Sequence, residues 1–587
     1  MVKLNEIIKY KIGYDKLEFN FKIYLLLIII FISNQKTSNS LTLNNKTNIQ
    51  RKLNSENYIN LTIKDKGKIN ILNILDEFPE NIPSEILLFE KPINFTLENG
   101  YDFRYKNKNY GSLYVCVNME ENNQTIIIKW NKTISNMMYM FFEAKSILTI
   151  DFTNFDSSSV VNMHNLFHNC YSLISLKLNN FDTSSITDMN GLFCCCYSLI
   201  SLDLNLLNTS SVTDMSYMFK NCRSLISLSL SNFDTSHVTN MKGLFEGCNK
   251  IEILDIKNFN TSSVTDMSYM FSKCSSLLSL DLTHFNTSVV TDMSYMFSMN
   301  GKVIIDNYDL DFENFYYFYD YFYVNEYNFS ILTSLNLNNF NTYSVENMEG
   351  MFSFLGIESL DLSKFNTHSV INMGFMFFFC TFLKSLEITN FETPSLEETS
   401  GMFCGCFSLK SLNLSSFDTS KVTLMMYMFA GCKSLISLDL SNFITTSCIS
   451  YYRMFYNCIN LEFINLENFI LLEDDLSEEF YLPIDDIFLN TSENLVYCIN
   501  KNSQYSNILE NQLNSKKCSV YDCSSNWRAK KKKMILNLDI CIENCRDLSL
   551  FEYNNKCYLE CPNETIPSNE YPYLCINAFE IQLILMK

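Results

Sequence analysis

Residues 224–248 read SLISLSLSNFDTSHVTNMKGLFEGC, and residues 276–297 read SLLSLDLTHFNTSVVTDMSYMF. The phenylalanine near the end of each unit recurs every 26 residues from Phe141 to Phe297, and a second series resumes at Phe352 with steps of 25 or 26. Self-similarity at such a fixed period is typical of a stacked repeat array. One unit alone cannot bury its apolar face, whereas stacked units bury a continuous core. The repeat therefore decides the fold.

Each unit has a strand-like half and a helix-like half. Leu176 and Leu178 lie two residues apart, so on a strand they share one face. A turn of Asp, Thr and Ser follows. Ser211 then stands three residues before Asp214, as in a helix-starting capping box, and residues 212–222 carry apolar side chains at roughly helical spacing. The pattern predicts an α/β solenoid with a parallel β-sheet on one face and short helices on the other.

The repeats resemble those of the BspA-like leucine-rich-repeat surface proteins, which read close to SLxxLDLSNFDTSxVTDMSxMFxxC. The resemblance covers residues 136–467, more than half of the chain. It implies a leucine-rich-repeat solenoid, secretion or attachment to the cell surface, and a role in adhesion, with no catalytic site. Many bacterial relatives are lipoproteins with a cysteine just after the signal sequence. The first cysteine here is Cys116, so we do not expect that anchor.

Two regions precede the array. Residues 1–38 are interpreted as a signal peptide, because the apolar run Tyr24–Ile32 follows scattered lysines and is too short to span a bilayer. An uncleaved signal anchor is the alternative, so membrane attachment stays open. Residues 39–135 lack the repeat and contain strand-like runs. We expect them to form an N-terminal cap, since a solenoid needs one to shield its first open face.

The array itself, residues 136–467, is interrupted once. The interval between Phe297 and Phe352 is 55 residues, which leaves about 29 extra residues near 298–326. They include an aromatic and acidic segment. Insertions in repeats commonly form loops on one face, often the binding face. The other interpretation is an irregular extra repeat that buries these rings.

Residues 468–587 are expected to form a small disulfide-rich module. Eight cysteines in a secreted context predict four disulfides of unknown connectivity. They are Cys498, Cys518, Cys523, Cys541, Cys545, Cys557, Cys561 and Cys575. Zinc binding is less favoured, because three residues separate the cysteines of CIENC and CYLEC. The basic run Arg528–Lys533 is interpreted as a solvated loop, with a sulfated-glycan contact or a processing site as alternatives.

Cysteines also recur inside the array. Most units carry one three residues after the repeat phenylalanine, as Cys222 follows Phe219. Free cysteine is among the most buried residue types, which favours a ladder of buried thiols. Disulfides between adjacent rungs are the alternative, because neighbouring strands are close enough for a bridge.

The strand halves turn two polar columns outward, one mainly of serines and one mainly of carboxylates and asparagines. Adjacent carboxylates such as Asp255 and Asp281 would repel each other across neighbouring strands, so water, cations or a basic partner should offset them. We therefore expect this strip to bind the ligand, with calcium as a possible cofactor. The candidate residues are Ser201, Ser279, Ser437, Asp203, Asp255, Asp281, Asp361, Glu387 and Asp439. A merely solvated face is the other interpretation.

Several Asn-x-Ser/Thr sequons occur in the array and would carry glycans if the host cell glycosylates the protein. The candidates are Asn260, Asn286, Asn328 and Asn413. A glycan at Asn413 would narrow the strip.

Composition limits the functions that are plausible. The net charge of −20 argues against nucleic acid as a partner of the whole chain. There is no Gly-rich phosphate loop, no H-E-x-x-H and no G-x-S-x-G, and only five histidines, so we expect no enzyme and no metal centre. The sequence predicts a secreted or cell-surface binding protein that recognises an extracellular protein or glycan. The alternative is a structural coat protein that associates with copies of itself.

Overall fold

The computed structural model describes most of the chain from residue 57 to residue 577. The exceptions within that span are residues 101–102, 106–107, 180, 301–331, 333, 472–485, 504–505, 536–539, 554–555, 564 and 569–572. The predicted signal peptide and Asn328 therefore lie outside the described residues. Among the helices that the structure describes, none has both the length and the apolar composition needed to cross a membrane.

The N-terminal region joins directly onto the first coil. Its main sheet has the strand order β11-β10-β1-β9-β3-β4, in which β1 pairs antiparallel with β10. Since β10 belongs to the first coil and β11 to the next, β1 covers the edge where the stack begins. The strands are β1 (Asn57–Ile63), β3 (Glu85–Leu88), β4 (Lys91–Pro92), β9 (Gln124–Trp130), β10 (Ile147–Asp151) and β11 (Ser175–Lys177).

A second, three-stranded antiparallel sheet completes this region, in the order β2-β8-β5. Its strands are β2 (Gly67–Leu75), β8 (Ser112–Met119) and β5 (Phe95–Asn99), and a hairpin of β6 (Phe103–Tyr105) and β7 (Lys108–Tyr110) lies between β5 and β8 in the chain. A single 3₁₀ turn, η1 (Pro79–Asn81), follows β2.

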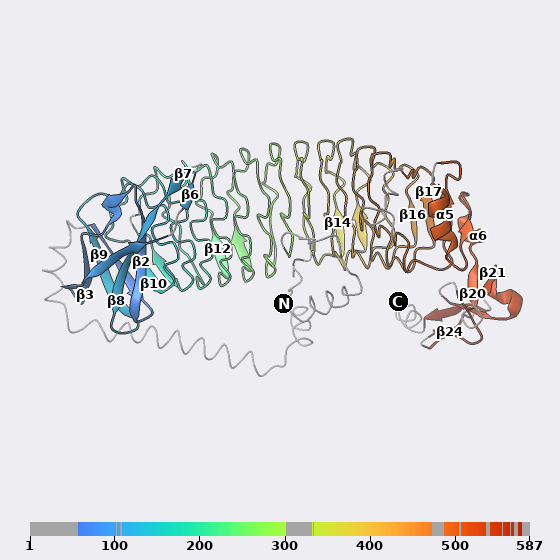
Figure 1. The fold of residues 1–587 in the computed structure, drawn as a ribbon, viewed down its shortest axis with the longest axis horizontal. Helices are drawn as coiled ribbons and strands as arrows, with labels where there is room; N and C mark the ends of the chain where they lie inside the picture. The colour runs from blue at the N-terminus through green and yellow to red at the C-terminus, as the bar shows by residue number, and fades with distance from the viewer. Residues whose placement is uncertain are drawn as a thin grey trace.

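The repeats form a β-solenoid of about 14 coils, which confirms the predicted stacked array. Figure 1 shows the coils side by side along the long axis, between the blue strands of the N-terminal region and the red C-terminal region. The repeat phenylalanines stack through the interior with neighbouring ring centroids 5.4 to 5.9 Å apart. This column consists of Phe141, Phe167, Phe193, Phe219, Phe245, Phe271, Phe297, Phe352, Phe377, Phe403, Phe429, Phe455 and Phe488.

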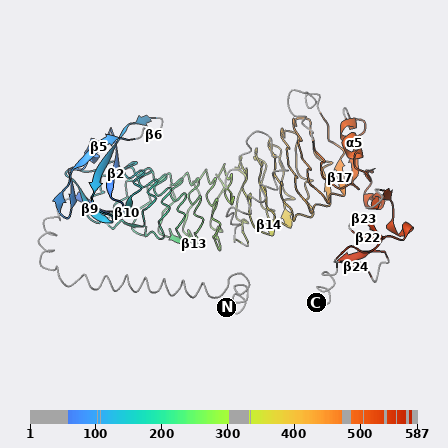
Figure 2. The same cartoon turned by 60° about the horizontal axis from the view of Figure 1, so that its bottom comes forward.

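The parallel sheet is less continuous than expected. Strands along the coils are mostly three residues long and pair locally, so positions such as 201–203 and 279–281 lie in register but outside a strand. Figure 2 shows the labelled strands β13, β14 and β17 along one edge of the stack. The parallel pairs are β12 (Ser227–Ser229) with β13 (Ile253–Asp255), β14 (Ser359–Asp361) with β15 (Ser385–Glu387), and β16 (Ser437–Asp439) with β17 (Phe463–Leu466).

The prediction of short helices on the opposite face is wrong: the described residues of the solenoid contain no helix. In residues 212–222 the backbone N–H groups alternate between two kinds of partner: Tyr217 N donates to the Lys242 carbonyl of the next coil at 2.8 Å, whereas Met218 N donates to the Met215 carbonyl of its own turn at 3.2 Å. Tyr217 (φ 57°) and Asn221 (φ 58°), four residues apart, adopt the left-handed conformation. Such residues interrupt any α-helix.

The predicted capping box is an Asx turn. The Asp214 carboxylate accepts a hydrogen bond from the Ser216 backbone N–H at 2.8 Å, two residues later, whereas a capping box would engage the third residue. The corrected fold is therefore a β-solenoid built from short strands and tight turns.

Two polar ladders accompany the phenylalanine column. In one ladder a buried threonine hydroxyl donates to a carbonyl of the next coil, and in most coils it also accepts from the N–H of the same residue, as Thr261 does with Asn286 at 2.8 Å in both bonds. Each ladder cysteine donates to a phenylalanine carbonyl, as Cys248 does to Phe219 at 3.1 Å. The ladder cysteines are free and buried, and burial raises the pKa of the Cys380 thiol to about 12. The structure therefore has thiols where rung-to-rung disulfides were the alternative.

The stack continues across the insertion. The ring of Phe297 stacks on that of Phe352 at 5.9 Å, and Met293 N donates to the Asn347 carbonyl at 3.0 Å. The coils on either side are thus direct neighbours, and the 29 extra residues leave the register intact. The aromatic segment of the insertion lies outside the described residues.

The C-terminal region closes the other end of the stack. Strand β17 pairs with β18 (Val496–Ile499), which pairs with β19 (Val520–Tyr521). Helix α5 (Ser506–Asn514) lies between β18 and β19 in the chain, and α6 (Trp527–Lys530) follows β19. Trp527 stacks on Phe463 with the ring centroids 4.8 Å apart. The remaining elements are β20 (Lys533–Ile535), β21 (Ile540–Ile542), η4 (Cys545–Leu548), β22 (Phe551–Tyr553), β23 (Lys556–Tyr558), β24 (Thr565–Pro567) and β25 (Cys575–Asn577).

The prediction of four disulfides in this region is confirmed. The pairs are Cys498–Cys523, Cys518–Cys541, Cys545–Cys557 and Cys561–Cys575. The basic run 528–533 differs from the solvated loop that we expected. Lys531 is buried and forms an ion pair with Glu462 at 2.6 Å, and Lys533 pairs with Glu552 at 2.6 Å. The first of these pairs ties the module to the last coils.

Candidate interaction surface

The predicted strip residues lie together on the outward side of the coils. Five of the six acidic side chains are exposed, and Asp255 is half-buried; Ser201 and Ser279 are exposed, and Ser437 is half-buried. The structure places Asp361 directly opposite Glu387 in the β14–β15 pair, and Ser229 opposite Asp255 in the β12–β13 pair. The strip therefore exists as a surface, although only one of these two strand pairs brings two carboxylates together.

The carboxylates also have a local structural role. Asp281 accepts hydrogen bonds from the backbone N–H and the hydroxyl of Thr283, at 3.0 and 2.6 Å. Asp203, Asp361 and Asp439 accept the N–H two residues later, at 3.1, 2.9 and 3.0 Å. These Asx turns end the strand segments. They explain why asparagine occupies the same column in other coils.

These hydrogen bonds stabilise the negative charges of the carboxylates, for which the sequence analysis expected water, cations or a basic partner. Burial raises the pKa of Asp255, but hydrogen bonds from Ser229 and Lys257 outweigh it, so the pKa is lowered overall. The side chain and then the backbone N–H of Thr283 lower the pKa of Asp281. Both carboxylates are therefore ionised at neutral pH. Among the described residues, the carboxylates of the strip do not gather into a group of three that could share a metal ion.

Sequence reasoning missed a row of exposed apolar side chains beside the serine column. Their exposed fractions are 43 to 62%. We call Ile174, Ile200, Ile226, Ile253 and Leu278 the apolar stripe. Ile253 stands one residue out of this column, opposite Ser227 of the serine column, and Glu252 occupies the column position in its coil. Backbone hydrogen bonds link these positions from coil to coil, for example Ile226 N to the Ile200 carbonyl at 3.3 Å. The stripe therefore lies on five neighbouring coils, and in the fourth of them the apolar side chain is displaced by one residue.

The signal for the stripe was present in the sequence. In SLISL the isoleucine follows a buried leucine, and a strand alternation that begins at the serine after it leaves the isoleucine out. The chain turns a corner at Leu173, however, so Ile174 and Ser175 both face outward. Two consecutive exposed residues are incompatible with a simple period of two.

The stripe does not run the length of the solenoid. In later coils the same column contains Glu358, Lys384 and Lys410, and Lys384 pairs with Glu358 at 2.8 Å. Among the described coils, those between residues 174 and 278 combine several apolar side chains with the hydroxyl and carboxylate columns, and Ile436 stands alone in a later coil.

The described sequon asparagines are exposed. Asn260 and Asn286 lie in the turns after the strand segments, and Asn413 lies in the carboxylate column of a later coil. Each side-chain oxygen accepts the N–H two residues later at 3.1 Å. Glycosylation stays a prediction. The turn positions would leave the apolar stripe open.

Four overlapping segments of the chain match one family model, whose description reads "Mycoplasma protein of unknown function, DUF285". The matched segments are residues 113–228, 225–334, 319–413 and 376–469. Together they span more than half of the chain and coincide with the coils described above. No curated protein and no solved structure matches the chain.

Proposed function

Because the chain belongs to the family described as Mycoplasma protein of unknown function, DUF285, we propose its role from the surface of its solenoid. The protein is a secreted or cell-surface binding protein that recognises an extracellular protein through the strip between residues 174 and 281. Within that role it is a BspA-like leucine-rich-repeat protein, a finer identity supported by its SLxxLDLSNFDTSxVTDMSxMF repeats.

The observation that carries the proposal is the apolar stripe. Single exposed apolar residues are ordinary on protein surfaces, but apolar side chains that gather on neighbouring coils mark an interaction site. Here the row runs beside hydroxyl and carboxylate side chains, which resembles an apolar interface centre with a polar rim. A protein partner fits this mixture better than a glycan does, because the stripe offers aliphatic groups without the aromatic platforms on which sugar rings stack.

The cysteine chemistry supports the extracellular location. Four disulfides in one small region are typical of proteins that fold in an oxidising compartment. The free cysteines of the solenoid are compatible with such a compartment, since nearly all of them are buried and buried thiols are unreactive.

The test replaces the stripe while leaving the coils intact. We expect the variant Ile174→Ser, Ile200→Ser, Ile226→Ser, Leu278→Ser to lose binding to cells and to a panel of extracellular proteins and glycans, with an unchanged melting temperature. Exposed side chains contribute little to the core, so stability should not change.

The matched control is Lys384→Ser with Lys410→Ser, at the same column in later coils. This variant should bind like the natural protein. Equal binding by the stripe variant and the natural protein would contradict the proposal.

The alternative function, a self-associating coat, concerns the same surface and has a different readout. Sizing chromatography and electron microscopy at rising concentration would show ordered assemblies that the stripe variant abolishes. That result, without binding to other molecules, would favour the coat. A monomer that binds cells through the stripe would favour recognition.

A further inference from the structure

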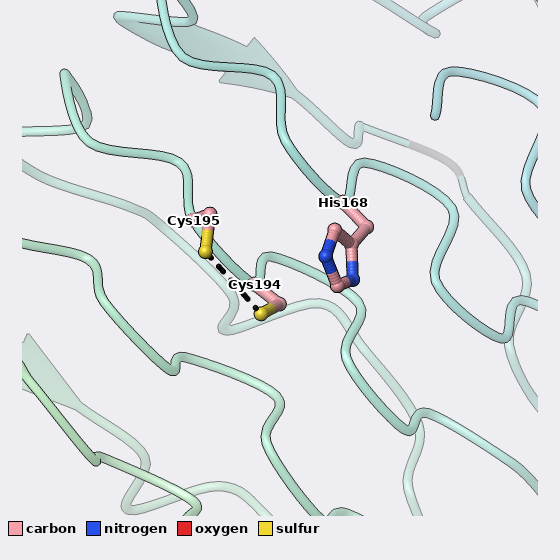
Figure 3. Close-up of side chains that lie close together, drawn as sticks. All are labelled: His168, Cys194 and Cys195. Carbon is pink, nitrogen blue, oxygen red and sulfur yellow. Dashed lines mark hydrogen bonds between the residues drawn. The ribbon is translucent and has the colours of Figure 1, made fainter. Parts of the chain in front are cut away.

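A second cluster of reactive side chains lies away from the strip, on the turn side of two neighbouring coils. His168, Cys194 and Cys195 bring a ring nitrogen and two sulfurs to within 4.8 Å of one another. The two sulfurs are 3.7 Å apart, and Figure 3 shows the imidazole facing them from the adjacent coil. Within the described part of the chain, this is the only group of three His, Cys, Asp or Glu side chains with such spacing.

The repeat explains how these residues meet. Cys194 stands 26 residues after His168, so the two occupy the same position in successive coils. The coils are held in register by Asn169 N, which donates to the Cys194 carbonyl at 2.9 Å. Cys195 adopts the left-handed conformation (φ 61°). In an extended strand its side chain would point away from that of Cys194, but here both sulfurs lie on one side.

A series of hydrogen bonds orients the His168 imidazole and places its proton on Nδ1. Asp188 accepts from His164 Nδ1 at 3.3 Å, and His164 Nε2 accepts from the Asn165 amide at 2.9 Å. The Asn165 amide oxygen in turn accepts from His168 Nδ1 at 2.7 Å. With its proton on Nδ1, His168 keeps a free lone pair on Nε2. Metal-binding histidines are oriented in this way by partners on their other nitrogen.

A glycine in the next coil leaves room for the Asn165 side chain in this series of hydrogen bonds. Gly191 has φ +59° and occupies the position of Asn165 one coil later; a Cβ there would collide with the Asn165 amide oxygen. Equivalent positions in later coils hold tyrosine, as at Tyr217 and Tyr269. The glycine is therefore required locally by the amide that orients His168.

The geometry suits one class of ion. A tetrahedral ion with Zn–S bonds of ~2.3 Å holds its two sulfurs ~3.8 Å apart, close to the 3.7 Å separation of the two cysteine sulfurs. Two thiolates and an imidazole select zinc-like cations, whereas calcium and magnesium require oxygen ligands. Cys194 is buried, while His168 and Cys195 are half-buried. One side of the site is therefore open to solvent.

We propose that His168, Cys194 and Cys195 bind one Zn²⁺ ion, with the imidazole Nε2 and the two thiolates as ligands and the fourth coordination position open. Binding releases the two thiol protons to water. The site lies apart from the apolar stripe, so it stands whether or not the proposed function does. Asn165 acts as a positioning residue, because it contacts His168 and not the ion.

The test uses the purified full-length protein with its four disulfides intact. Zinc content and competition with a chromophoric chelator give stoichiometry and affinity, and Co²⁺ substitution reports thiolate ligands through its charge-transfer band. We expect one ion per chain with a two-thiolate cobalt spectrum. Cys194→Ala, Cys195→Ala and His168→Gln should each weaken zinc binding at least roughly 100-fold, and Asn165→Ala roughly 10- to 100-fold.

The matched control is Cys404→Ala, because Cys404 occupies the position of Cys194 in a later coil where Phe378 replaces the histidine. Alanine occupies this column naturally at Ala430, so the alanine variants should fold. The control should bind zinc like the natural protein. Three results would overturn the proposal: equal zinc binding by all variants, a cobalt spectrum without thiolate bands, or a Cys194–Cys195 disulfide in the protein as isolated.

Discussion

At the scale of single residues, the buried threonine does more for the coil than its size suggests. Its hydroxyl donates to a carbonyl of the next coil and in most coils also accepts the N–H of that same residue, and it recurs along the stack. The ladder consists of Thr183, Thr209, Thr235, Thr261, Thr287, Thr342, Thr367, Thr393, Thr419 and Thr445. The backbone at this corner cannot bond to its own neighbours, so the side chain replaces a strand partner.

Thr261→Val tests this role. Valine keeps the shape but leaves the Asn286 N–H and carbonyl without their partner, which should destabilise the protein by about 1–3 kcal/mol. The midpoint of urea unfolding measures the change. Thr261→Ser restores the hydroxyl and should recover most of the loss, since Ser157 occupies this position in the first coil. A valine variant as stable as the natural protein would contradict this account.

Much of the interior could be predicted from single residues, and the turn face could not. The period of Phe219 and its equivalents fixed the core column, because large apolar side chains at a constant interval must stack. The left-handed positions were missed because tyrosine and asparagine occupy many of them, as at Tyr217 and Asn221. A signal existed in the glycines, since Gly191 and Gly247 fall in these same two columns.

At the scale of elements, the Asx turn replaces the helix that we expected. Three carboxylate or amide columns per coil accept backbone N–H groups two residues later, for example at Asp182, Asp214 and Asp203. The capping-box pattern and the Asx-turn pattern share the same residue types, so the sequence could not separate them. The bonds between coils decide in favour of the turn.

These turns predict an acid-sensitive stability. The Ser184 backbone N–H and then its side chain lower the pKa of Asp182, and the side chain and then the backbone of Ser236 lower that of Asp234. A carboxyl with a lowered folded-state pKa contributes stability above its unfolded pKa and loses it as the pH falls through the folded value. The melting temperature should therefore fall between about pH 5 and about pH 3.

The triple variant Asp182→Asn, Asp234→Asn, Asp418→Asn should lessen that fall, because asparagine makes the same turn without titrating, as Asn208 does. The corresponding alanine variant should instead be less stable at every pH, since it lacks the acceptor. Melting temperatures measured across the pH range distinguish the two. An asparagine variant with the same acid dependence as the natural protein would show that these carboxyls are not responsible.

Only part of the candidate surface could be predicted from strand alternation. Strand alternation correctly placed the carboxylate column outside, at Asp203 and Asp281. It failed one residue earlier, where the corner at Leu173 exposes two consecutive side chains. The apolar stripe depends on that corner, and a corner is set by bonds to neighbouring coils, which a period of two does not encode.

At the scale of the whole molecule, a stack of coils has two open ends, and strand β1 covers the first. Leu61 on β1 is fully buried opposite Ile150 of the first coil and Ile126 of β9. Leu61→Asp should detach the strand and expose the edge of β10. Unpaired edges associate with one another, so sizing chromatography should show oligomers that grow with concentration.

The matched change is Lys64→Asp, just beyond β1, where the side chain is exposed. This variant should remain of natural size. Monomeric Leu61→Asp protein at all concentrations would mean that β1 is not what keeps the first coil from pairing.

The direction of the bonds between coils has a mechanical consequence. They run along the axis of the stack, so a pull on the two ends loads them in series and not side by side. The molecule would then lengthen in steps, each releasing one 26-residue coil, or ~90 Å of extended chain. The β1–β10 strand pair at one end and the disulfide-bonded module at the other determine the force at which the first coil detaches from the stack.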